Sequence, residues 1–186
     1  IKGPVTGLPI PARAEIAIEG YVMPDERLPE GPFGEWTGYY GSNVREEPVT
    51  HVKALYHRNN PIILGSPPVK PPSGKSYTHS ILRSAALLEE LEKAGVPDIK
   101  GIWFHEAGGA KMLIALAIKQ RYPGHAKQAA VLASQARTGV YMGRFVVVVD
   151  EDINPMDLEE VIWAMCTRSD PSQDIDIVRR CWSGPL

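Results

Sequence analysis

The residue types best suited to chemistry gather in one short segment, where two carboxylates flank a Gly-Pro-Phe-Gly sequence. Glu30 and Glu35 are five positions apart, and three aromatic residues follow within residues 36–40. Glycine-rich backbone can pass close to a planar ligand, and aromatic side chains can form its walls. Neighbouring carboxylates can also hold different pKa values, so that one stays ionised while the other delivers a proton. The same residues are equally compatible with an exposed turn above packed aromatic rings.

Other segments carry weaker signals. Gly108-Gly109 follows a predicted strand and could bind phosphate, but it lacks the G-x-G-x-x-G spacing, so a strand-to-helix turn is favoured. His105-Glu106 points to a metal site, but the run is not H-E-x-x-H, so this interpretation is discounted. The acidic residues 150–152 suit a hard cation, although an acidic loop at a strand end is favoured. Basic residues at predicted helix ends, in residues 121–128 and at Arg137, could meet a phosphate-bearing ligand. Most of these cations are expected to be solvated charges that complement the helix dipole.

The distribution of proline divides the chain into two halves, which are expected to hold different kinds of secondary structure. Residues 1–72 hold 12 of the 17 prolines, which predicts short strands and ordered loops in the first half. Alternating apolar residues predict strands over 14–22 and 49–56, and residues 61–64 could begin a third. Two or three strands bury little apolar surface by themselves. We therefore expect the first half to be part of a β-barrel or of a larger sheet.

The second half alternates helical and strand patterns, which predicts a layered α/β domain. A run of β-branched residues makes 145–150 the strongest predicted strand, covered on both faces. Asn154-Pro155 is expected to open the last helix, as an N-cap followed by proline. In order, we expect a helix over 77–94, a strand over 99–104, helices over 110–120 and 126–135, a strand over 145–150 and a helix ending near residue 167.

Composition excludes several functional classes. With 20 Lys and Arg against 22 Asp and Glu, the net charge of −2 argues against binding to nucleic acid or to an anionic membrane. No apolar run approaches the roughly 18 residues that a membrane-spanning helix needs. Cys166 and Cys181 require no disulfide framework and lack zinc-site spacing, so we expect a cytoplasmic protein.

The chain resembles the UbiD family of decarboxylases, which use prenylated FMN. The resemblance covers nearly the whole chain and is most specific at the Glu-Gly-Pro-Phe-Gly-Glu block. It implies part of a split β-barrel of the FMN-binding type, followed by a layered α/β C-terminal domain. The implied bounds are 1–66 for the barrel part, 67–75 for a Pro-rich linker and 76–186 for the C-terminal domain. The blocks that carry the resemblance are residues 11–20, 29–35, 56–62, 78–80, 148–153 and 163–168.

The resemblance also implies an activity and its residues. The activity is reversible, non-oxidative decarboxylation of an aromatic or α,β-unsaturated acid, with proton transfer through a Glu-Arg-Glu network. Glu35 is the implied proton donor, and Glu30 would hold the arginine, which lies outside this chain. Arg137 is implied near the cofactor phosphate. The residues implied to line the substrate are Leu82, which also meets the cofactor, Pro185 and Leu186.

The implied partners follow from the same resemblance. The cofactor is prenylated FMN, supplied by a flavin prenyltransferase and held with a divalent Mn or Mg ion, with K⁺ as an optional second ion. No metal ligand is expected within this chain. We expect a homo-oligomer, and we expect these residues to be a piece of a longer decarboxylase. A truncated subunit or assembly module that needs a partner chain is one alternative, and a hydrolase that uses Glu30 and Glu35 as a carboxylate pair is another.

Overall fold

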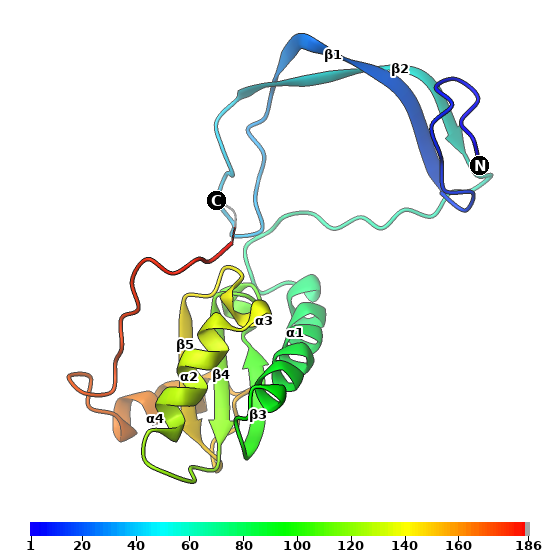
Figure 1. Cartoon of the computed structure of the whole chain (residues 1–186). Helices are drawn as coiled ribbons and strands as arrows, with labels where there is room; N and C mark the ends of the chain where they lie inside the picture. The colour runs from blue at the N-terminus through cyan, green and yellow to red at the C-terminus, as the bar shows by residue number, and fades with distance from the viewer. Residues whose placement is uncertain (185–186) are drawn as a thin grey trace. The chain divides into compact units, whose positions relative to one another are not determined.

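The computed structural model describes residues 1–184 and divides the chain into two compact units, Ile1–Val69 and Lys70–Leu186. Their boundary lies inside the segment 67–75 that the sequence predicts as a linker. The two units are described separately below (Figure 1). Among the described residues, no helix is long and apolar enough to cross a membrane.

The N-terminal unit is built on an antiparallel ribbon of two long strands, β1 (Ile16–Glu30) and β2 (Arg45–His57) (Figure 1). Both strands are longer than predicted, and residues 61–64 form no strand. The prolines within β1 and β2 are tolerated because each strand of a two-stranded sheet has a free edge, where a missing amide costs no ladder bond. The register shifts between Val22 and Arg27, beside Pro24. The described residues form no closed barrel.

The buried carboxylate of Glu19 in β1 connects residues 5–6 to this ribbon by hydrogen bonds. Glu19 is only 4% exposed and accepts hydrogen bonds from the Val5 and Thr6 amides, the Thr6 hydroxyl and the Tyr56 hydroxyl. The bonds from Thr6 are the main reason that the pKa of Glu19 falls from 4.5 to about 2. Glu19 therefore stays ionised and organises the turn that precedes β1.

The C-terminal unit is a three-stranded sheet with helices on both faces (Figure 1). The strand order is β3-β4-β5, with β3 antiparallel and β5 parallel to the central β4. Two apolar clusters lie on opposite faces of β4: Ile114 and Leu116 belong to one, Ala115 and Ala117 to the other. The strands are β3 (Ile99–Phe104), β4 (Leu113–Ile118) and β5 (Phe145–Asp150), and the helices are α1 (Gly74–Lys93), α2 (His125–Gln135), α3 (Arg137–Val140) and α4 (Leu158–Arg168).

The helix predicted over 110–120 is wrong, because that segment contains β4. Its sequence Leu-Ile-Ala-Leu-Ala-Ile is apolar at every position, and periodicity alone cannot assign such a run to a helix or a strand. A 3-10 turn (Glu106–Gly108) reverses the chain so that β4 pairs with β3. Leu116 and Ala117 lie in opposite clusters, as successive residues of a strand do.

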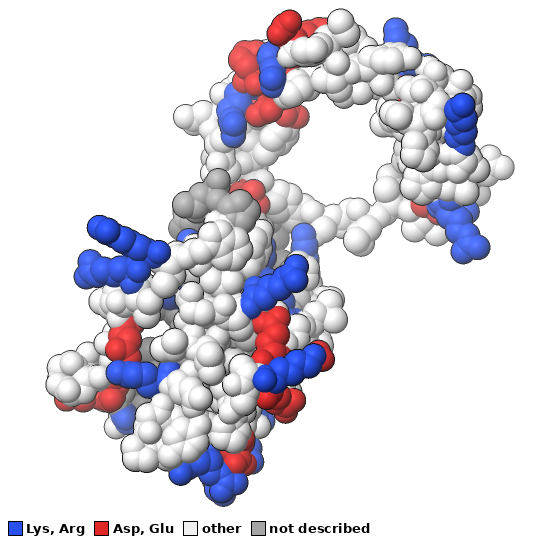
Figure 2. Space-filling model, in the orientation of Figure 1, with Lys and Arg blue, Asp and Glu red and all other residues white. Residues whose placement is uncertain are grey.

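The last helix begins later than predicted. Asp157 is its N-cap and accepts from the amides of Glu159 and Glu160, whereas Asn154 accepts from the Met156 amide in the preceding turn. Both are good capping residues, so the pattern alone did not decide between them. Figure 2 shows basic and acidic side chains intermixed over the face of this unit that is in view, which differs from a basic nucleic-acid-binding stripe.

Candidate functional site

The two carboxylates predicted to do chemistry lie at the end of β1 and in the hairpin that follows it. Glu30 is the last residue of β1, and Glu35 lies in a turn where its amide donates to the Tyr39 carbonyl at 2.7 Å. The Gly41 amide donates to the Phe33 carbonyl at 3.0 Å and closes the hairpin. Gly31 has a φ of +91°, which glycine adopts without strain. The local sequence therefore forms an ordered hairpin that exposes both carboxylates.

The carboxylate of Glu35 is partly oriented by its own backbone. Its Oε1 accepts from the Trp36 amide at 2.8 Å. Among residues 1–184, no arginine forms an ion pair with Glu30 or Glu35; Arg45, opposite Glu30 in the ribbon, instead lies 3.5 Å from Glu47. The structure thus places both glutamates in one segment, and the predicted Glu-Arg-Glu network stays a prediction.

The residues predicted to meet the cofactor lie in the C-terminal unit. Leu82 is 64% exposed on α1, and Arg137 is the exposed first residue of α3. Arg83, next to Leu82, donates to the carbonyl of Thr138, next to Arg137, at 2.6 Å. This contact brings the Leu82 turn of α1 to the turn that carries Arg137. Pro185 and Leu186 lie outside the described residues.

Positive charge gathers along this part of α1. Burial, and then the charges of Lys75, Lys111 and Arg83, hold the pKa of His79 below its usual value of 6.5. The Arg137 guanidinium makes no hydrogen bond or ion pair with any described residue. An exposed guanidinium without a described partner fits the phosphate end of a flavin nucleotide, because it favours an anion.

A metal ion does not fit the described residues. Within residues 1–184, no three His, Cys, Asp or Glu side chains lie close enough together to hold one. Two acidic residues at or just after the end of β5 are instead neutralised by Arg168, whose guanidinium nitrogens lie 2.8 Å from Asp152 and 3.2 Å from Asp150. The acidic-loop interpretation of residues 150–152 therefore agrees with the geometry.

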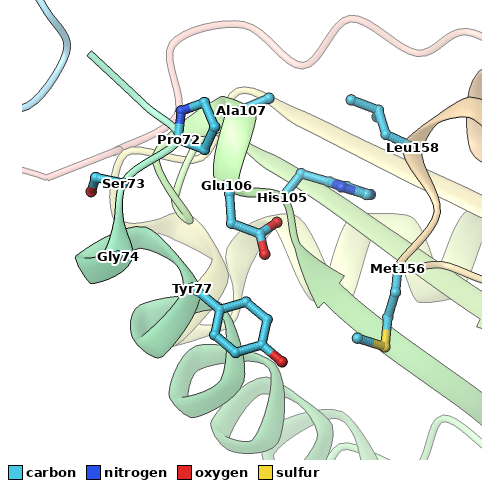
Figure 3. A pocket seen from close by; sticks show the side chains of 9 residues that line it. All are labelled: Pro72, Ser73, Gly74, Tyr77, His105, Glu106, Ala107, Met156 and Leu158. Atoms are coloured by element: carbon cyan, nitrogen blue, oxygen red, sulfur yellow. The ribbon is translucent and has the colours of Figure 1, made fainter. Parts of the chain in front are cut away.

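A cavity of about 550 Å³ opens beside the turn after β3 (Figure 3). Glu106 points into it near Tyr77, and its Oε2 accepts from the Trp103 indole at 3.0 Å. His105 is 3% exposed, and burial lowers its pKa, so it is neutral at pH 7. The carboxylate of Glu106 repels phosphate from this cavity. The lining residues are Pro72, Ser73, Gly74, Tyr77, His105, Glu106, Ala107, Met156 and Leu158.

At Gly108-Gly109, the possible phosphate-binding turn, the backbone of Leu113 packs closely against Gly108. A Cβ on Gly108 would lie 2.9 Å from the Leu113 amide nitrogen, so the chain passes tightly there. No helix follows the glycines, because the next element is β4. The expected strand-to-helix turn is therefore a strand-to-strand turn.

The sequence interpretation missed Arg83 and Glu90, which hold α3. Both lie on α1, seven residues apart, beside the buried stripe that includes Ser84 and Leu87. An arginine and a glutamate two helical turns apart, at the edge of a buried stripe, are a signal that could have identified them.

Two family models together match nearly the whole chain. The 3-octaprenyl-4-hydroxybenzoate carboxy-lyase Rift-related domain matches residues 1–71, and the C-terminal domain of that carboxy-lyase matches residues 76–186. An uncharacterized protein of Archaeoglobus fulgidus is 38% identical in a match 175 residues long, which covers 91% of this chain and 34% of that protein.

Solved structures of UbiD-class enzymes are similar to the chain over almost its full length. HmfF from Pelotomaculum thermopropionicum in complex with FMN is 34% identical, with a TM-score of 0.78 over 98% of this chain and 40% of HmfF. An evolved dimeric HmfF in complex with prFMN is 35% identical, with a TM-score of 0.76 over 96% of this chain and 40% of that one. Vanillic acid decarboxylase of Sedimentibacter hydroxybenzoicus, in open form with truncated ShVdcD, is 32% identical, with a TM-score of 0.77 over 95% of this chain and 37% of that one.

The chain spans 34–40% of the length of these relatives. Its mixed α and β architecture is that of the UbiD-class enzymes to which it is similar. Because the Rift-related and C-terminal family models match residues 1–71 and 76–186, the chain belongs to the UbiD family of carboxy-lyases.

Proposed function

We propose that this chain forms part of a UbiD-type enzyme that decarboxylates an aromatic or α,β-unsaturated carboxylic acid reversibly, using prenylated FMN. The observation that carries the proposal is the ordered hairpin that exposes Glu30 and Glu35, in a chain matched by both family models. Similar proteins support the ligand classes: HmfF is described with FMN and prFMN, and vanillic acid decarboxylase acts on an aromatic acid.

Glu35 is the proposed proton donor to the carbon that loses CO2. The bond from the Trp36 amide to Oε1 fixes one carboxylate oxygen and leaves the other to exchange a proton. Glu30 is its proposed network partner, through an arginine outside this chain. Such an arginine would favour the ionised carboxylates, and exclusion of water would favour the protonated ones. The chemistry that prenylated FMN supplies when bound is an electron sink for the breaking carbon–carbon bond.

Arg137 is proposed to bind the flavin phosphate, because its guanidinium is exposed and unpaired among the described residues. Leu82, exposed on the adjoining turn of α1, is proposed to contact cofactor and substrate. Pro185 and Leu186 stay proposed substrate contacts. The bounds 1–66, 67–75 and 76–186, the homo-oligomer, the metal held from outside this chain and the supplying prenyltransferase are further parts of the proposal.

The direct experiment uses the intact protein that contains this chain, produced together with a flavin prenyltransferase. Intact mass and the visible spectrum are recorded on one sample, which is then given a panel of aromatic and acrylic acids. We expect flavin absorbance and release of CO2 from at least one acid, with no activity when FMN replaces the prenylated cofactor. Absence of flavin at a mass of 20.4 kDa would favour the truncated subunit, and activity without any flavin would favour the hydrolase.

A further inference from the structure

The helix α3, which begins at Arg137, does not cap itself. It has four residues, its N-cap Ala136 offers no side-chain acceptor, and Tyr141 follows it in an extended conformation. The end groups of such a short helix need partners from elsewhere. The neighbouring helix α1 supplies partners at both ends (Figure 1).

Glu90 of α1 serves the N-terminal side. Its two carboxylate oxygens accept from the Thr138 amide at 3.1 Å and from the Thr138 hydroxyl at 2.7 Å. A carboxylate is well suited to this end, because the first turn of a helix carries unsatisfied amides and partial positive charge. The residue after Arg137 is therefore fixed by two hydrogen bonds to one side chain.

Arg83 of α1 serves the C-terminal side. Its Nη2 donates to the Thr138 carbonyl at 2.6 Å and to the Tyr141 carbonyl at 3.3 Å. The guanidinium lies 4.8 Å from the centre of the Phe104 ring, and its Nε is buried without a hydrogen-bond partner. No carboxylate among the described residues forms an ion pair with Arg83. A partly desolvated cation that binds carbonyls instead of a carboxylate is costly for a purely stabilising contact.

We infer that Arg83 and Glu90 are positioning residues that hold α3 so that the Arg137 guanidinium meets the flavin phosphate. Arg83 and Glu90, which carry opposite charges on one face of α1, bind the two sides of α3. The Arg137 guanidinium pairs with no described residue and is left to bind the phosphate. The inference rests on the proposed function, which assigns Arg137 to that phosphate. It adds that phosphate binding depends on two side chains that do not touch the flavin.

The test measures binding of FMN and of riboflavin, which lacks the phosphate, to the intact protein by quenching of flavin fluorescence. The variants are Arg83→Gln, Glu90→Gln and Arg137→Gln. Glu90→Gln keeps the shape of the side chain but leaves one acceptor oxygen for two donors. Glu89→Gln is the matched control, because Glu89 lies beside Glu90 and pairs with exposed Lys93 instead of with α3.

We expect each of the three variants to weaken FMN binding by about tenfold, since one charge-assisted hydrogen bond contributes about 1.5 kcal/mol. Riboflavin affinity and the Glu89→Gln control should change less than about twofold, which is within the usual effect of a surface change. The double variant of Arg83 and Arg137 should lose less than the sum of the single losses, because the two residues act on one contact.

The outcomes separate the inference from the proposed function. If Arg137→Gln leaves FMN binding unchanged, the assignment of Arg137 to the phosphate is wrong, and the inference with it. If Arg137→Gln weakens FMN binding while Arg83→Gln and Glu90→Gln do not, only the positioning role is overturned. A parallel loss of FMN and riboflavin affinity in the Arg83 and Glu90 variants would show a general structural role and would also overturn it. Thr138→Val, which removes only the hydroxyl bonded to Glu90, gives a milder second variant.

Discussion

Glu19 fixes the start of the N-terminal unit through a single buried carboxylate. Because its folded-state pKa of about 2 lies below the usual 4.5, its contribution to stability is complete above pH 4.5 and is lost as the pH falls toward and through 2. We predict that Glu19→Gln weakens the pH dependence of stability in this range. Urea unfolding of the intact protein between pH 2.5 and pH 5 measures it.

The matched control for this prediction is Asp25→Asn, which changes an exposed carboxylate of the same strand. The control should unfold with the pH dependence of the unmodified protein. An equal acid dependence in the Glu19→Gln variant would show that Glu19 does not contribute as described.

The residue types marked the segment of Glu30 and Glu35 as a candidate site, but an exposed turn fits the same residues equally well. Their separate roles came from the family resemblance and not from spacing. Arg83 and Glu90 were missed because each is an ordinary residue of an amphipathic helix, and their importance depends on which turn packs beside them. Sequence spacing within one helix does not reveal that partner.

At the scale of elements, physical patterns identified α1, β3, α2 and β5 because each has a clear period or a β-branched run. The pattern failed at β4, where both faces are buried and the apolar run has no period. A strand covered on both faces and a buried helix give the same short apolar sequence, so only the pairing with β3 and β5 distinguishes them.

Close packing of α3 against α2 depends on Gly139. A Cβ at this position would lie 1.9 Å from the Ala133 carbonyl oxygen, so the backbone of one helix would have to move. We predict that Gly139→Ala lowers the free energy of unfolding by about 1–3 kcal/mol, the usual cost of overpacking. It should also weaken FMN binding, since α3 carries Arg137. Urea unfolding and flavin fluorescence measure the two effects.

The control is Gly74→Ala at the start of α1, where a Cβ would meet no atom within 4 Å. This change should leave stability unchanged or slightly raised, because alanine favours the helix. If Gly139→Ala were as stable as this control, the described contact of α3 with α2 would be wrong.

At the scale of the whole molecule, the two units differ in how they are stabilised. The C-terminal unit has an apolar cluster on each face of its sheet, whereas the described N-terminal ribbon exposes apolar residues such as Ile18 and Leu55. Two strands bury little apolar surface by themselves. The order of family blocks predicted the family correctly, because blocks spread over the whole chain are more specific than any one motif.

The central claim is that Glu35 transfers the proton at the carbon that loses CO2. The measurement is the rate of deuterium incorporation into product by the intact protein loaded with prenylated FMN in D2O. Glu35→Gln is compared with Glu46→Gln, an exposed glutamate of the same unit. We expect this rate to fall by about 10²–10⁴-fold for Glu35→Gln, as for loss of a general acid, with retained flavin absorbance and little change for Glu46→Gln. Deuterium incorporation by the Glu35→Gln variant at the rate of the unmodified protein would contradict this claim.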